Sequence, residues 1–142
     1  MTGEQIEMLV PAVTGVVIMG GAGWLICIMA ARGANGKLRR NPLMGIRTAA
    51  TQASDEAWAA AHIASEKQTR MGGVGAIVAG LLSSAIALLG VFGIASADVA
   101  APFSAGAVLA GAAWLVAWAL RATVVGNRAA RAAEQERIAR GA

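Results

Sequence analysis

Three long tracts without a charged residue constrain this chain more than any other feature of its sequence. They run over residues 8–31, 71–97 and 99–120, and none contains Lys, Arg, Asp, Glu or His. An α-helix needs about 20 apolar residues to cross the ~30 Å hydrocarbon core of a bilayer. A soluble helical bundle would need polar faces toward water, and these tracts show no polar stripe. The sequence therefore predicts an all-α integral membrane protein with three transmembrane helices.

The composition supports this prediction, because 57% hydrophobic residues, 14% charged residues and a mean hydropathy of +0.61 do not suit a soluble domain of 142 residues. We expect a single membrane domain over residues 1–142. Its segment 32–70 should form a cytoplasmic loop and a juxtamembrane helix, and residues 121–142 a basic cytoplasmic tail. The one cysteine, Cys27, lies in the first tract, so no disulfide framework or cysteine metal site within one chain is expected.

The basic residues indicate the orientation in the membrane. Seven of the twelve lie between the first and second tracts and five follow the third: Arg32, Lys37, Arg39, Arg40, Arg47, Lys67, Arg70, then Arg121, Arg128, Arg131, Arg137 and Arg140. The N-terminal segment and the connection near Asp98 have none. Because loops rich in Lys and Arg stay in the cytoplasm, we expect the N-terminus outside and the C-terminus inside. Anionic lipid headgroups account for such flanking charges, so no nucleic acid partner is expected.

Small residues recur within the tracts at spacings that let helix backbones approach closely. These are Gly20, Gly21 and Gly23 in the first tract, Gly75-xxx-Ala79 and Gly80-xxx-Ser84 in the second, and Gly106-xxx-Ala110 and Ala107-xxx-Gly111 in the third. Tracts rich in Ala also produce such matches by chance. Whether any match packs, and whether it packs within one chain or between copies in a homo-oligomer, stays open.

The densest chemical variety lies in residues 41–62, NPLMGIRTAATQASDEAWAAAH. A helix is expected to begin at Ser54, whose side chain suits an N-cap position. Asp55 and Glu56 then occupy the first turn, where the helix dipole favours acids. Good helix formers continue to about Arg70, so this helix precedes the second span and can run into it.

On that helix Asp55, Trp58, His62 and Ser65 share one face. In one interpretation, Arg47 pairs with Asp55 or Glu56. Trp58 and His62 then present a docking surface or form a packed polar site. In the other, Trp58 is an interfacial anchor at the headgroup level and Arg47 snorkels to hold the helix against the bilayer. The packed site requires His62 to hydrogen-bond through a defined ring nitrogen.

Catalysis is not indicated by these residues. One His, no usable Cys and two adjacent carboxylates form no recognisable nucleophile and base, and the sequence has no HExxH motif or phosphate-binding Gly-rich loop. Metal binding would need ligands beyond His62, Asp55 and Glu56. Transport of ions or protons normally requires ionisable groups inside the spans, and the three tracts have none. We therefore expect a protein that is not an enzyme and carries no cofactor.

The same region resembles the signature loop of the SdpI-like family of bacterial membrane proteins, which is named for an immunity protein against a secreted toxin. The resemblance is carried by Asn41, Gly45, Ile46, Arg47, Thr48, Ser54, Asp55, Glu56, Trp58 and His62. It implies a minimal three-span module of the bacterial inner membrane, with a role in immunity or signalling through a cytoplasmic or membrane protein partner. A small accessory subunit of a larger membrane complex is the alternative.

Overall fold

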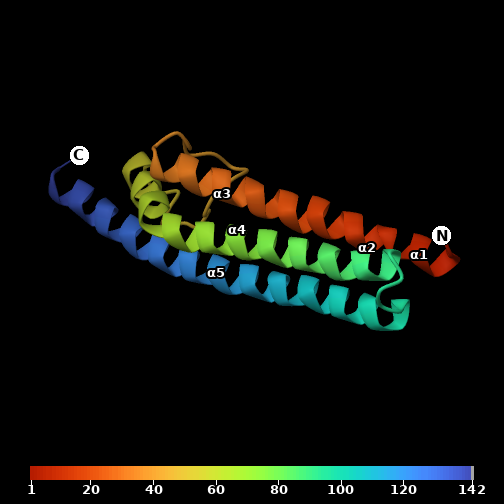
Figure 1. Ribbon diagram of the computed structural model, residues 1–142. Coiled ribbons are helices and arrows are strands. Elements are labelled where there is room, and N and C mark those ends of the chain that lie inside the picture. The colour runs from red at the N-terminus through yellow and green to blue at the C-terminus, as the bar shows by residue number, and fades with distance from the viewer. Residues whose placement is uncertain (142) are drawn as a thin grey trace. The chain divides into compact units, whose positions relative to one another are not determined.

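The computed structural model describes residues 1–141, and its elements are helical (Figure 1). They are α1 (Gly3–Glu7), α2 (Leu9–Thr14), the π-helix η1 (Gly15–Gly20), α3 (Gly21–Ala34), α4 (Asp55–Val91) and α5 (Ala97–Ala139). Three runs of helix are long and apolar enough to cross a membrane: Gly3–Ala34, Asp55–Val91 and Ala97–Ala139. The predicted all-α fold with three spans is confirmed.

The juxtamembrane helix and the second span are one continuous helix, α4. Its N-terminus is capped as predicted, since the backbone N–H of Ala57 donates to Ser54 Oγ at 3.1 Å. At the other end α4 stops at Val91, before the end of the 71–97 tract. Gly93 adopts a positive φ of 69°, which favours glycine, and the N–H of Ile94 turns back to bond Leu89 O at 2.9 Å.

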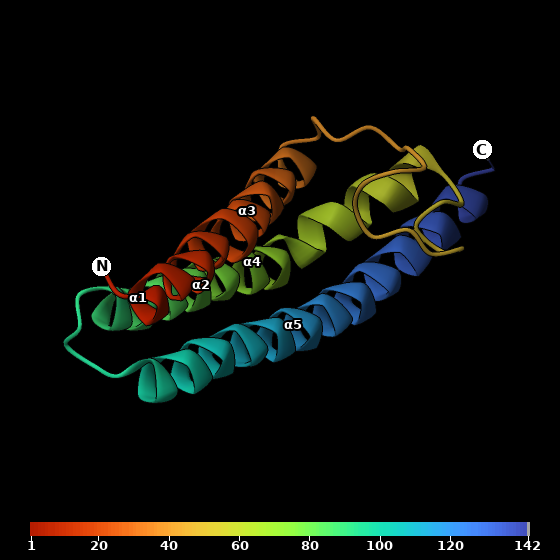
Figure 2. The same cartoon turned by 90° about the vertical axis from the view of Figure 1, so that its right-hand side faces the viewer.

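The chain divides into two compact units, which are described separately. The first comprises Met1–Leu25 and Gly72–Val116, and the second comprises Ile26–Met71 and Ala117–Ala142. In the first unit α4 lies between the first span and α5 (Figures 1 and 2). Many large apolar side chains of this unit are exposed, among them Val10, Val13, Val17, Val78, Leu81, Phe103 and Leu109. Such a surface suits a lipid bilayer, where apolar side chains have no reason to be buried.

The two small-residue pairs of the second tract face different neighbours in this unit. On the side of the first span, Ser84 Oγ donates to Ala12 O at 2.5 Å, and a Cβ added at Gly80 would lie 2.5 Å from Gly15 O. The helices therefore touch backbone to backbone here. The nearest atoms, Gly15 O and Gly20 N, belong to the backbone and could not move aside for a larger residue at Gly80.

On the α5 side, the ring of Trp114 fills the space that a side chain at Gly75 would need, since an added Cβ would lie 2.1 Å from the ring. A Cβ at Gly111 would lie 2.3 Å from that of Ala79, and Ser83 Oγ bonds Ser104 Oγ at 2.8 Å. Gly106, in contrast, has open space around it. Its spacing to Ala110 marks no contact in the part of the chain described.

Candidate functional site

The second unit holds the motif, whose residues 41–54 lie on the loop that connects α3 to α4 and whose residues 55–62 form the start of α4. The last turn of α3 closes when the N–H of Lys37 bonds Arg32 O at 2.9 Å across Gly36, whose φ is 67°. Just beyond, Leu38 O accepts the indole N–H of Trp58 at 2.7 Å. The loop is therefore attached to α4 soon after it leaves α3.

Asn41 shapes the next part of the loop. Its Oδ1 accepts the backbone N–H groups of Leu43 and Met44 at 2.9 and 2.7 Å, while its amide donates to Arg39 O at 2.8 Å. A short amide side chain can replace backbone partners in a turn in this way, and the following Pro42 fixes the direction of the chain. The motif asparagine is thus used inside the loop.

His62 bonds the returning arm of the loop to α4. The side chain is only 7% exposed, its Nδ1 bonds Trp58 O at 2.8 Å, and its Nε2 lies 3.1 Å from the backbone N of Ile46. Because the Ile46 N–H donates, Nε2 must accept, and the ring proton belongs on Nδ1. This contact requires the neutral ring. Burial lowers the pKa of His62, although its bond to Trp58 O acts in the opposite direction.

Only a glycine at position 45 lets the loop backbone come this close to the His62 ring, for two reasons. Its φ of 91° lies in the region that side chains disfavour. An added Cβ would also lie 2.3 Å from His62 Nε2 and 3.1 Å from the ring of Trp58. The two rings pack against each other with centroids 4.2 Å apart. The glycine of the Gly-Ile-Arg-Thr run therefore lets the loop rest directly on the Trp–His pair.

Two threonines fix the remainder of the loop. Thr51 is fully buried, and its hydroxyl donates to Ile46 O at 2.6 Å while accepting the N–H of Thr48 at 3.0 Å. The Thr48 hydroxyl reaches α5, where it donates to Asn127 Oδ1 at 2.5 Å. Nearby, Gly126 leaves room for Ile46, since an added Cβ would lie 3.1 Å from its side chain. The loop is thereby bonded to α5 as well as to α4.

The charged residues pair differently from the first of the two sequence interpretations, in which Arg47 reaches Asp55 or Glu56. Asp55 instead bonds Arg40 Nε at 2.9 Å, and Arg40 also donates to Gln52 O at 2.8 Å. Arg47 donates to Pro42 O. Sequence separation could not discriminate between two arginines that the same turn-rich loop brings near the helix start.

The start of α4 also contacts the tail part of α5 within the second unit. Hydrogen bonds from Arg137, which lies 2.8 Å away, and from the Ser54 hydroxyl lower the pKa of Glu134 to about 2. The motif acid Glu56 is exposed, and its charge adds to the stronger effect of Glu134 in raising the pKa of Arg137.

Trp58 and His62 are both buried, at 3% and 7% exposure, so neither lies on an exposed docking face and Trp58 does not lie free at a headgroup layer. The hydrogen bonds of a packed polar site are present instead. Sequence reasoning missed Arg40, Thr51 and Asn127 as members of the site. Asn127 had one signal, as the first amide after the apolar third tract.

The arrangement offers a folded surface in which the polar motif side chains bond one another and the backbone. Both nitrogens of the single histidine are occupied by backbone groups, so a base with a free nitrogen is not available there. Among residues 1–141, no three His, Cys, Asp or Glu side chains gather as a metal site would require.

Fold and site together define a class of protein: a multi-pass helical membrane protein whose first interhelical loop is folded onto a buried Trp–His pair. The model of the SdpI/YfhL protein family matches residues 37–126, more than half of the chain, and the chain belongs to that family. The match includes the whole motif, so the predicted resemblance is confirmed. A comparison with the curated proteins and one with the solved structures each gave no match.

Proposed function

We propose that this chain is a non-enzymatic protein of the bacterial inner membrane that acts in immunity or signalling through the loop between α3 and α4. The main support is the use of the motif residues as internal bonds. Gly45, Trp58 and His62 hold the loop in one conformation and leave loop residues such as Leu43 exposed. A conformation fixed in this way reduces the entropy that binding would otherwise cost.

His62→Ala tests this proposal in a bacterial strain that lacks the protein and is challenged with culture supernatants of neighbouring strains. Removing the imidazole leaves the Ile46 N–H without its acceptor, at a cost of about 1 to 3 kcal/mol. The loop should loosen, and protection should be lost while the amount of protein in the membrane stays near normal.

Ser65→Ala is the matched control, because Ser65 is also buried on α4 but its hydroxyl donates to Ala61 O of the same helix, at 2.8 Å, and not to the loop. It should keep protection. Equal protection by wild type and His62→Ala would contradict a role of the fixed loop. Recovery of the purified protein with a stoichiometric partner would favour an accessory subunit of a larger membrane complex.

The proposed orientation places the N-terminus outside and the loop in the cytoplasm. It rests on the twelve basic residues, all of which lie between the first and second spans or after the apolar part of the third. A reporter active only outside the cytoplasm should be silent when fused after Ala142 and active when inserted near Asp98. The reverse pattern at both positions would place the loop outside.

A further inference from the structure

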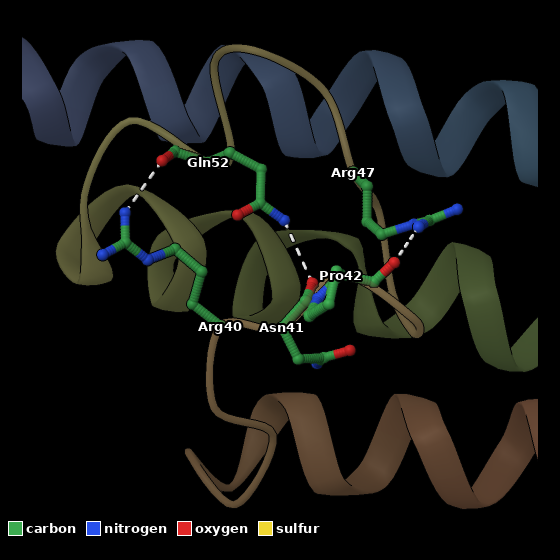
Figure 3. A pocket seen from close by; sticks show the side chains of 5 residues that line it. All are labelled: Arg40, Asn41, Pro42, Arg47 and Gln52. Carbon is green, nitrogen blue, oxygen red and sulfur yellow. Dashed lines mark hydrogen bonds between the residues drawn. The ribbon is translucent and has the colours of Figure 1, made fainter.

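A pocket of about 470 Å³ opens on the loop and has a basic lining. It is lined by Arg40, Asn41, Pro42, Arg47 and Gln52, which include no acidic residue (Figure 3). Figure 3 shows the two guanidinium groups at opposite ends of this row. The Arg40 end is already neutralised by Asp55 at 2.9 Å. Any free attraction for an anion therefore comes from the Arg47 end.

Arg47 retains most of its bonding capacity. It forms no ion pair with a described residue, and one of its terminal nitrogens donates to Pro42 O. A guanidinium carries five N–H donors in a planar fork that fits two oxygens of a phosphate or carboxylate. Arg47 thus presents a charge that no described residue pairs, with further N–H donors, at one end of the pocket lining (Figure 3).

Apolar side chains lie beside this charge. Leu43 and Met44, between the pocket residues Pro42 and Arg47, are 80% and 51% exposed. Two adjacent exposed apolar residues on a loop with basic residues around them form an amphipathic surface, which suits the boundary between headgroups and acyl chains.

The position of the loop along α3 fits the same boundary. A Cβ added at Gly33, in the last turn of α3, would lie 3.0 Å from the Cβ of His62, whose ring accepts from Ile46 N–H. The returning arm of the loop is therefore level with the end of α3. That end directly follows the uncharged tract 8–31, where a span leaves the hydrocarbon.

We propose that this pocket binds the phosphate of an anionic phospholipid. Arg47 donates to the phosphate oxygens, while Leu43 and Met44 enter the interfacial layer beside it. The lipid chains continue into the bilayer that surrounds the spans. Such a site is specific to one arginine of the loop, whereas general attraction to an anionic surface would involve every basic residue equally.

The test uses native mass spectrometry of the purified full-length protein with added dioleoyl phosphatidylglycerol or dioleoyl phosphatidylcholine. Wild type should retain phosphatidylglycerol over phosphatidylcholine. Arg47→Gln should weaken that retention about fivefold, as expected for the loss of one basic residue near an anionic lipid. Arg39→Gln removes the same charge from the same loop outside the pocket, and should leave retention near wild type.

A double variant, Leu43→Ser with Met44→Ser, keeps every charge and should also weaken retention of phosphatidylglycerol. Equal losses in Arg47→Gln and Arg39→Gln would overturn the pocket in favour of general surface charge. Equal retention of the two lipids would overturn recognition of an anionic headgroup. Complete displacement of the lipid by millimolar inorganic phosphate would show a soluble anion as the occupant and overturn the lipid proposal.

Discussion

Gly45→Ala should release the loop between α3 and α4 from the Trp–His pair while the spans stay folded. The φ of 91° alone would strain an alanine, and strain of this kind costs about 1 to 3 kcal/mol. In addition, the new methyl group would lie 2.3 Å from His62 Nε2, the atom that accepts the Ile46 N–H. To make room for this methyl group, the imidazole and the loop would have to separate, which would break that bond. Hydrogen exchange of the 43–50 region and tryptic cleavage after Arg47 should both accelerate strongly.

Gly36→Ala provides the matched control for this effect. Gly36 also has a positive φ, 67°, but an added Cβ there meets nothing within 4 Å. The Gly36→Ala variant should lose about 1 to 2 kcal/mol of stability from the unfavourable φ alone. The hydrogen bond between Ile46 N–H and His62 should stay intact. If both variants gave the same exchange rates at Ile46, contact with His62 would not be what holds the loop.

Gly23→Ala should cause the largest loss of stability among single-methyl changes in the first span. An added Cβ would lie 2.4 Å from Gly73 O and 2.9 Å from the backbone N of Ile77, and backbone atoms cannot rotate away as side chains can. The helices would have to separate, and overpacking of this kind costs about 1 to 3 kcal/mol or more. The midpoint of thermal unfolding in mild detergent should fall clearly.

Gly21→Ala adds the same methyl group two positions earlier, where nothing lies within 4 Å. Because alanine has the higher helix propensity, this variant should be neutral or slightly stabilising. A similar drop in both midpoints would show that the glycines matter for backbone freedom and not for close helix packing.

These paired glycines also show where sequence reasoning ends. The spans could be predicted because the hydrocarbon core of a bilayer requires long uncharged helices, and every residue of such a tract contributes to the hydropathy that reveals it. Which glycine touches a neighbour depends on how the helices are rotated, so Gly21 and Gly23 look equivalent in the sequence and differ in the structure. The chance matches expected in Ala-rich tracts include Gly106, which packs against nothing described.

Of the site, the helix face could be predicted from the sequence, but the segments that cover it could not. The 3.6-residue period placed Trp58 and His62 on one face correctly, since that is a local property of the helix. What covers the face is not local: Leu38 and Ile46 come from the preceding loop, and the loop itself bonds Asn127 far along the chain. For the same reason, the interpretation that pairs Arg47 with Asp55 or Glu56 differs from the structure, in which Asp55 bonds Arg40.

The π-helix η1 determines which side of the first span faces α4. Gly15 and Gly23 both meet α4, the former at Gly80 and Ser84 and the latter at Gly73 and Ile77. In a uniform α-helix these eight positions would turn by about 800°, leaving the two glycines about 80° apart. Between them, the wider i→i+5 turns of η1 rotate the chain less per residue. This stretch thus brings both glycines to the same side of the first span, whereas a helical wheel drawn with constant spacing would separate them by about 80°.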